Sequence, residues 1–198
     1  FTYSRFPNWF IVFIFCHVRK FYMNFIFLKV FIIILYLISP TKAYSIDQPI
    51  LKNLILHKEP KIINDFEFKN QNNRSLKLLD FKGKLLILNF WATWCLPCKE
   101  EMPSLDKLLN SNKFNNLEVI PINIGKENVS KSITFFEETN IKNLKIYYDN
   151  NFDIPRKLLL RGIPTTLLID KDGKEFARII GSIDFQDEKF LNWLLNFD

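Results

Sequence analysis

Residues 91–98 read Trp-Ala-Thr-Trp-Cys-Leu-Pro-Cys, and this stretch decides more about the fold than any other. Two cysteines, Cys95 and Cys98, stand two residues apart shortly after the strongly apolar run 85–90. Such a run predicts a buried strand, and the periodicity that follows it predicts a helix. The positive end of the helix dipole would then point at Cys95 and stabilise a thiolate. Two cysteines at this spacing can close a small disulfide ring, so the stretch predicts a redox-active dithiol.

Strands and helices are expected to alternate on either side of this stretch. The predicted strands are 66–68 and 75–78, which form a hairpin, and 85–90, 117–124, 145–148, 166–170 and 175–180. The predicted helices are 98–109, 129–139, 154–160 and 185–196. A strand–helix–strand order in the middle implies a parallel pair, and the late hairpin implies antiparallel strands beside it. Residues 44–61 are mixed and polar, and we expect an irregular tether there.

The N-terminal part of the sequence is predicted to be a leader, 1–43. It holds five of the 27 basic residues and none of the 21 acidic ones. Counted from Met23, a short basic region, a nine-residue apolar run and small residues before position 44 resemble a secretory signal peptide, and 1–22 is then an upstream extension. An uncleaved membrane anchor is the alternative. Either reading places the rest of the chain in an export compartment, most simply a bacterial periplasm, whether soluble after cleavage or tethered to the inner membrane.

Charge and cysteine usage exclude several function classes. Outside the leader the chain is close to neutral, so no nucleic-acid groove is expected. Of the three cysteines, Cys16 belongs to the leader, and two neighbouring cysteines cannot staple distant segments. A zinc site needs further ligands, and His57 is the only histidine outside the leader. We therefore expect no metal and no small cofactor. A purely structural disulfide is the remaining alternative role for Cys95 and Cys98.

The motif resembles the thioredoxin superfamily. Residues 99–103, Lys-Glu-Glu-Met-Pro, and 161–166, Arg-Gly-Ile-Pro-Thr-Thr, look like its exported TlpA/ResA branch, as does the Asn89-Phe90 lead-in. The resemblance covers about 60–198. It implies a thioredoxin-like domain over 62–198, in which a mixed sheet is flanked by helices and extended by an N-terminal hairpin. It further implies thiol–disulfide exchange as the activity.

The resemblance also implies roles for individual residues. Cys95 attacks the substrate disulfide, Cys98 resolves the mixed disulfide, and Pro164 lies against the dithiol with a cis peptide bond. Trp94, Ile163 and Thr165 are substrate-binding candidates, with Ile163 pairing through its backbone with an extended segment.

A carboxylate that handles the Cys98 proton is harder to place. Cytoplasmic thioredoxins bury an Asp where this chain has Asn89, and an amide cannot do that work. Glu127, after the second central strand, is the candidate, although it is displaced by one residue from the expected position; a solvated loop charge is the alternative. Residues 99–101 are expected to lie in the first helical turn, where acidic side chains suit the helix dipole.

The favoured function is an exported reductase of protein disulfides. Its substrates would be of the cytochrome c or cytochrome oxidase copper-site maturation type, and its electrons would come from a membrane thiol reductant. The dipeptide between the cysteines lacks the histidine typical of strong oxidants, which favours a reductase. A copper-binding assembly chaperone using the same two cysteines is the alternative. A thiol peroxidase is a third reading, but Thr93 stands two residues before Cys95 instead of three.

Overall fold

The apolar run 85–91 forms strand β4 (Leu85–Trp91), whose seven residues are all buried. The structure is a computed structural model and describes residues 29, 31, 51, 53–149 and 151–198. These residues build an eight-stranded sheet in the order β1-β8-β7-β4-β5-β6-β2-β3. Strand β4 pairs in parallel with β5 and antiparallel with β7, so the sheet is mixed, as the sequence predicts.

The other elements have short connections between them. The remaining strands are β1 (Leu54–Ile62), β2 (Glu67–Asn70), β3 (Ser75–Lys77), β5 (Leu117–Asn123), β6 (Tyr147–Tyr148), β7 (Thr165–Ile169) and β8 (Lys174–Ile180). The α-helices are α2 (Leu96–Leu109), α3 (Val129–Glu138), α4 (Asp153–Lys157) and α5 (Glu188–Leu194), and short 3-10 turns are η1 (Leu78–Phe81) and η2 (Leu195–Phe197).

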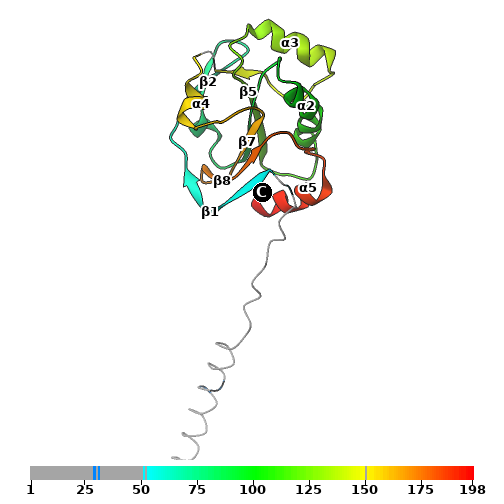
Figure 1. Cartoon of the computed structure of the whole chain (residues 1–198). Helices are drawn as coiled ribbons and strands as arrows, with labels where there is room; N and C mark the ends of the chain where they lie inside the picture. The colour runs from blue at the N-terminus through cyan, green and yellow to red at the C-terminus, as the bar shows by residue number, and fades with distance from the viewer. Residues whose placement is uncertain (1–28, 30, 32–50, 52, 150) are drawn as a thin grey trace, which may run out of the picture. The chain divides into compact units, whose positions relative to one another are not determined.

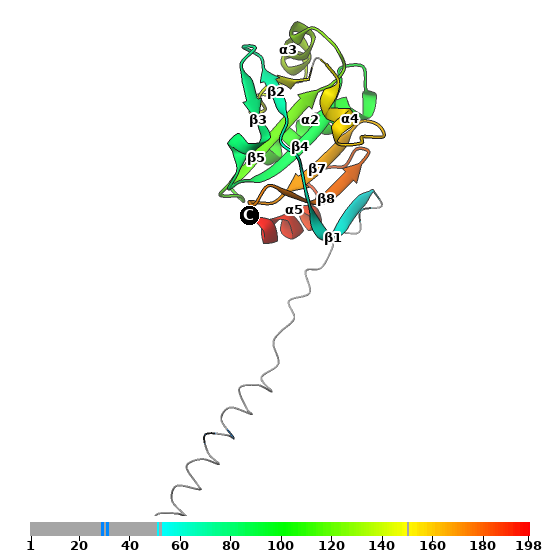
Figure 2. The same ribbon diagram turned by 90° about the vertical axis from the view of Figure 1, so that its left-hand side faces the viewer.

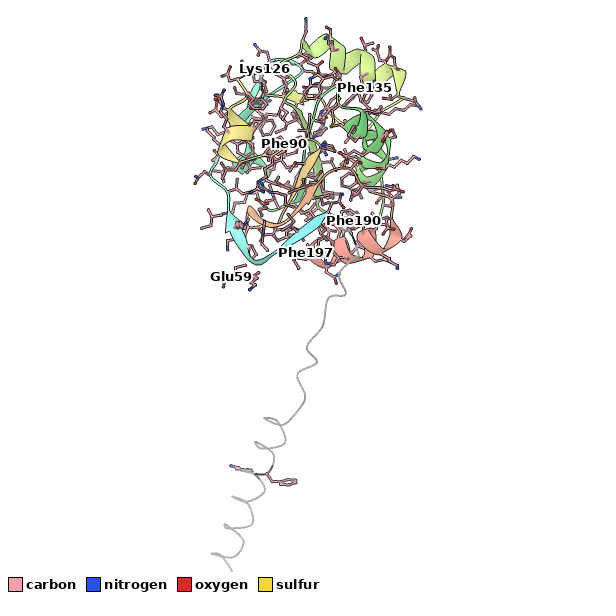
Figure 3. The ribbon with its side chains drawn as sticks, in the orientation of Figure 1. Glu59, Phe90, Lys126, Phe135, Phe190 and Phe197 are labelled. Atoms are coloured by element: carbon pink, nitrogen blue, oxygen red, sulfur yellow. A yellow bond between two sulfur atoms is a disulfide. The ribbon has the colours of Figure 1, made fainter. Side chains whose placement is uncertain are left out.

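Two buried apolar clusters lie on opposite faces of the sheet. One face is covered by α2, α3 and α5, and Figure 1 shows these helices together on one side. Phe135 and Phe190 belong to this cluster, and both are labelled beside α3 and α5 in Figure 3. Phe90 belongs to the second cluster, on the face that carries α4 and η1. Because α4 has only five residues, this second face is covered less completely.

The expected hairpins and helices are confirmed to within a few residues. In the first hairpin Phe68 is opposite Leu76, and the polar stretch between the strands forms the turn. The second joins β7 to β8. Helix α2 begins two residues before the predicted position, because Cys95 and not a later residue caps it. The C-terminal helix is shorter than predicted and ends in a 3-10 turn.

The prediction of an irregular tether over 44–61 is wrong for its described C-terminal part. Residues 54–62 form strand β1, which pairs antiparallel with β8 at the edge of the sheet, as Figure 2 shows. Most side chains of β1 are exposed, so the strand needs no alternation of apolar and polar residues, and its sequence shows none. Charged residues and Pro60 are typical of edge strands, where they discourage further pairing. The folded domain therefore begins at Leu54 or earlier, and not at 62.

The predicted leader, 1–43, lies outside the described residues except for Lys29 and Phe31 and stays a prediction. Among the residues that are described, no helix is both long enough and apolar enough to cross a bilayer.

A buried carboxylate ties the long helix to the loop before β6. Asp106 of α2 is 7% exposed and accepts hydrogen bonds from the backbone N–H groups of Asn143 (2.7 Å) and Leu144 (2.9 Å). Its second oxygen accepts from Asn143 Nδ2 at 2.9 Å. The helix that carries the cysteines is thereby held to the chain beyond α3.

We predict that Asp106→Ala destabilises the protein by about 2–4 kcal/mol, because it leaves one buried and one partly buried backbone donor without a partner. Urea denaturation of the oxidised protein measures this. Asp172→Ala, at an exposed turn position, is the matched control and should change stability by less than about 0.5 kcal/mol. Equal effects of the two substitutions would contradict the prediction.

Candidate active site

The two cysteines stand at the junction of β4 and α2. They form a disulfide with an S–S distance of 1.99 Å. Cys95 is the N-cap of α2, and its Sγ accepts a hydrogen bond from the Cys98 N–H at 3.3 Å. A thiolate at Cys95 would therefore receive a backbone hydrogen bond and the positive end of the helix dipole.

The surface over the disulfide is apolar. In the oxidised protein Cys98 is fully buried and Cys95 is only 6% exposed, so the disulfide itself offers little surface to solvent. The side chains on either side of it are open to solvent, since Trp94 is 66% and Leu96 is 65% exposed. Two large exposed apolar side chains around a reactive group are suited to contact another protein.

The loop before β7 brings the cis proline to the same end of the sheet. The Ile163–Pro164 peptide bond is cis, as the resemblance implies. Thr165 is opposite Phe90 of β4, so the loop lies beside the end of the strand that leads to the cysteines. Ile163 packs against the buried cluster that contains both cysteines.

Thr165, a predicted substrate-binding residue, is 2% exposed. Its Oγ1 donates a hydrogen bond to the Gly162 carbonyl oxygen at 2.7 Å. The hydroxyl therefore holds the cis-proline loop in shape, and this geometry favours a positioning role over direct hydrogen bonding to a substrate.

Glu127, the predicted proton acceptor, is bound to the stretch just before the cysteines. Its carboxylate accepts hydrogen bonds from Thr93 N (3.0 Å), from Thr93 Oγ1 and from Asn123 Nδ2 (3.3 Å). Burial raises the pKa of Glu127, but these hydrogen bonds and the Lys131 charge outweigh it and lower the pKa overall. A carboxylate with a lowered pKa is a weak base, so its surroundings favour a role in holding the 91–95 turn.

Glu101 is the buried carboxylate of the site. It lies on α2, one turn after Cys98, and is 3% exposed. Burial raises the pKa of Glu101 to about 8, although hydrogen bonds from Asn89 and from the Ile183 N–H act in the opposite direction. Glu101 is therefore mostly protonated at neutral pH in the oxidised protein, and it can gain or lose a proton close to that pH.

Asn89 connects Glu101 to the sheet. Its Nδ2 donates to Glu101 Oε1 at 2.8 Å and to Thr166 Oγ1 at 2.9 Å. Its Oδ1 is buried and has no hydrogen-bond partner among the described residues. A side-chain amide offers both donors and an acceptor, so Asn89 can donate to an ionised Glu101 or, with its amide turned over, accept from a protonated one.

The sequence contains a signal for Glu101 that the helix-dipole interpretation overlooked. Cys98, Glu101, Met102 and Leu105 recur at spacings of three and four, which places them on one face of a helix. The buried members of α2 include all four. A glutamate on the apolar face one turn after the second cysteine is a candidate buried acid, whereas Glu100 next to it is exposed.

A redox-active disulfide, a cis proline and a buried carboxyl at one end of a mixed sheet define a thioredoxin-fold oxidoreductase. In the described part of the chain no three His, Cys, Asp or Glu side chains are grouped so that they could hold a metal ion. The sequence pattern of the AhpC/TSA family matches residues 61–174, and the chain belongs to this family.

Two curated relatives of this chain are named as thiol-disulfide oxidoreductases. The chain is 35% identical to the thiol-disulfide oxidoreductase ResA of Geobacillus thermodenitrificans over 127 residues, which are 63% of this chain and 71% of ResA. It is 29% identical to ResA of Bacillus cereus over 150 residues, which are 76% of this chain and 86% of that protein. The chain is thus a thiol–disulfide oxidoreductase of the ResA type.

Solved structures share the fold. A thiol:disulfide interchange protein DsbE from Chlorobium tepidum, described as putative, superposes with a TM-score of 0.60 at 24% identity and covers 71% of this chain and 99% of its own. A DsbF homologue from Corynebacterium diphtheriae gives a TM-score of 0.61 at 23% identity, with 74% and 95% covered. Both confirm the thioredoxin-like fold predicted from the sequence.

We predict that the stability of the oxidised protein falls between about pH 5 and pH 8 and that Glu101→Gln removes most of this fall. In the unfolded chain a glutamate ionises near pH 4.3, whereas folded Glu101 keeps its proton up to about pH 8. The unfolded state therefore binds fewer protons in this window, and stability declines as the pH rises, by on the order of a few kcal/mol. Urea denaturation from pH 5 to pH 9 measures the slope. Parallel curves for the native protein and the variant would contradict the prediction.

Proposed function

We propose that this chain is a reductase of disulfides in exported proteins, with Cys95 as the attacking thiol and Cys98 as the resolving thiol. The observation that carries the proposal is the buried Glu101 carboxyl, one helical turn from a fully buried Cys98. External disulfides cannot reach the buried Cys98 thiol, and Glu101 can accept the Cys98 proton or return it.

The reaction proceeds by two thiol–disulfide exchanges. The Cys95 thiolate attacks one sulfur of the substrate disulfide, a mixed disulfide forms, and the other substrate sulfur leaves as a thiolate that takes up a proton. Cys98 then loses its proton and attacks Cys95 Sγ. The mixed disulfide breaks, the Cys95–Cys98 disulfide forms, and the substrate leaves with both of its sulfurs reduced.

Glu101 is the group we assign to the Cys98 proton, in place of Glu127. Burial brings its pKa to about 8, close to that of a thiol, and matched values favour proton transfer in both directions. In the ionised form Glu101 accepts the proton from Cys98 during resolution. In the oxidised protein it holds that proton and returns it to Cys98 when an electron donor opens the disulfide.

The same carboxyl favours electron flow toward the substrate. A strong oxidant in this fold gains its power from a stabilised reduced form. Once Glu101 has lost its proton, its carboxylate charge opposes a second negative charge at Cys98 and so raises the energy of the Cys98 thiolate. The Leu96-Pro97 dipeptide between the cysteines contributes no imidazole or other cation to offset this effect. Both features stabilise the disulfide relative to the dithiol.

The surroundings of the dithiol support a protein as substrate. We assign Trp94 and the backbone of Ile163 to contact with the substrate and Thr165 to holding the loop at Pro164. By resemblance, the substrates are the haem-binding cysteines of apocytochrome c or a copper-site protein of cytochrome oxidase assembly, and the electron donor is a membrane thiol reductant. From the predicted leader we infer that the domain lies in the periplasm, soluble after cleavage or tethered to the inner membrane. Thr93 stands two residues before Cys95 instead of three, which argues against the peroxidase alternative.

We predict a midpoint potential near or below about −220 mV for the Cys95–Cys98 pair, in the range of thioredoxin and glutaredoxins. Titration against glutathione and dithiothreitol buffers, with free thiols counted, measures it. A value near about −120 mV, as in a strong periplasmic oxidant, would reverse the proposed direction of electron flow.

We predict that Glu101→Gln slows resolution of the mixed disulfide about 100-fold at pH 7, because water must then accept the Cys98 proton. The measurement is the lifetime of the mixed disulfide with a model substrate from pH 5 to pH 9. Glu127→Gln is the matched control, and it should keep the ionisation near pH 8 that the Glu101 variant loses. If the Glu127 variant lost this ionisation and the Glu101 variant kept it, Glu127 would be the proton acceptor of Cys98.

A further inference from the structure

A cleft of about 850 Å³ lies between β1, β8 and α4, next to the cis-proline loop. Thr165, which directly follows Pro164, lines one end of it. Figure 2 shows α4 on the same side of the domain as β8 and β1. The cleft exists because the five-residue α4 does not extend across the outer strands. We call it the β1–α4 cleft.

Exposed apolar side chains surround the β1–α4 cleft. Ile62 is 83% and Leu159 is 79% exposed, and Ile55 and Ile180 are 47% and 40% exposed. They come from β1, β8 and the segment after α4. Single exposed apolar residues are ordinary, but several around one hollow mark a surface that binds another molecule.

One of these exposed residues, Leu159, has a backbone conformation that leucine rarely adopts. Its φ is 53°, in the left-handed region that a leucine adopts at a cost of about 1–2 kcal/mol. Its side chain projects into solvent and recovers little of this cost by burial. Strained residues of this kind concentrate at binding sites.

The buried charges at the base of the cleft balance one another. Glu175 is 3% exposed and accepts hydrogen bonds from Arg178 Nε (2.7 Å), Arg178 Nη2 (2.9 Å) and His57 Nε2 (3.0 Å). Burial raises the pKa of Glu175, but these bonds and charges lower it overall, so it stays ionised opposite Arg178. Arg178 also donates to the Leu158 carbonyl oxygen at 3.1 Å, which ties the end of α4 to β8.

The charges at the rim of the cleft are not balanced. Lys61, Lys157 and Arg161 line the cleft, and none of them forms an ion pair with a residue that the structure describes. The one acidic group at the rim is Asp65, whose carboxylate accepts the Leu79 N–H at 3.1 Å. An apolar hollow with a positive rim complements an acidic and apolar occupant.

We propose that the β1–α4 cleft binds an extended acidic segment with apolar side chains that adjoins the target disulfide of a protein substrate. The proposal rests on the proposed function, because it requires a protein substrate at the dithiol. The position of the cleft beside Pro164 suits a chain that continues past the reacting cysteine. Its hollow shape suits a peptide better than the flat surface of an anionic membrane.

Two labelled peptides test the proposal against the full, oxidised chain, in which no exchange takes place. Each carries a disulfide ring and a flank in which leucine alternates with glutamate or with lysine. Fluorescence anisotropy should show the glutamate peptide binding at least about tenfold more tightly, and the preference should fall as salt is added. Equal affinity for the two peptides would overturn the proposal.

Charge reversal locates the binding surface. Lys61→Glu combined with Lys157→Glu should invert the preference between the peptides, while reduction of a small aromatic disulfide stays unchanged. Lys107→Glu combined with Lys189→Glu makes the same change of charge on exposed positions of α2 and α5, on the other side of the sheet, and should leave the preference intact. If both double variants lose the preference equally, the cleft is not the binding surface.

Leu159→Asn separates binding from folding. Asparagine accepts the left-handed conformation more readily than leucine, so thermal stability should stay equal or rise. Affinity for the glutamate peptide should fall about fivefold, since one apolar contact is lost. Unchanged affinity in this stable variant would argue against the cleft.

Two further measurements distinguish peptide binding in the cleft from membrane binding, and the cleft proposal from the proposed function. Vesicles of phosphatidylserine and phosphatidylcholine should bind the native chain and the Lys61/Lys157 variant alike; loss of vesicle binding with intact peptide selectivity would make the cleft a membrane contact and overturn the proposal. An oxidising midpoint potential together with intact selectivity for the glutamate peptide would overturn the proposed direction of electron flow and would support the cleft.

Discussion

The burial of β4 on both of its faces is the constraint on which the rest of the structure depends. All seven residues of Leu85–Trp91 are inaccessible, so helices must cover the sheet on both sides of this strand. Its pairing with β5 and β7 brings the ends of three chain segments together. The cysteines follow β4, the Glu127 turn follows β5, and the cis proline precedes β7. The active site is thus assembled where these central strands meet solvent.

The mechanism that we propose depends on one buried carboxyl, Glu101, beside that junction. Helix α2 presents Cys98 and Glu101 on the same face, one turn apart, where water is excluded. Burial makes ionisation of Glu101 costly, and the Asn89 amide can match either of its protonation states. Glu127, with several donors around it, is instead stabilised as an anion and holds Thr93. Two carboxyl groups near one disulfide therefore have opposite pKa shifts and suit different tasks.

The unequal cover of the two sheet faces has a consequence for recognition. Three helices close one face, whereas the short α4 leaves the outer strands of the other face partly open beside the cis-proline loop. The internal ion pair of Glu175 and Arg178 fixes the base of this opening, and the cations at its rim form no ion pair within the described part of the chain. The surface that we assign to selecting the substrate thereby borders the cis-proline loop, because Thr165, which follows Pro164, lines it.

The sequence by itself determined the elements whose signals are local. The apolar run of β4 and the two cysteines predicted a buried strand that leads to a dithiol at the start of a helix, because buried strands and tight motifs leave distinct patterns. The Ile163-Pro164 motif carried the resemblance that implied a cis proline. Only the tertiary structure decided the rest. Strand β1 is held by backbone pairing with β8 and carries no apolar alternation. Burial raises the pKa of Glu101, and hydrogen bonds from Thr93, 34 residues away in the chain, contribute to lowering that of Glu127; no local pattern records either environment.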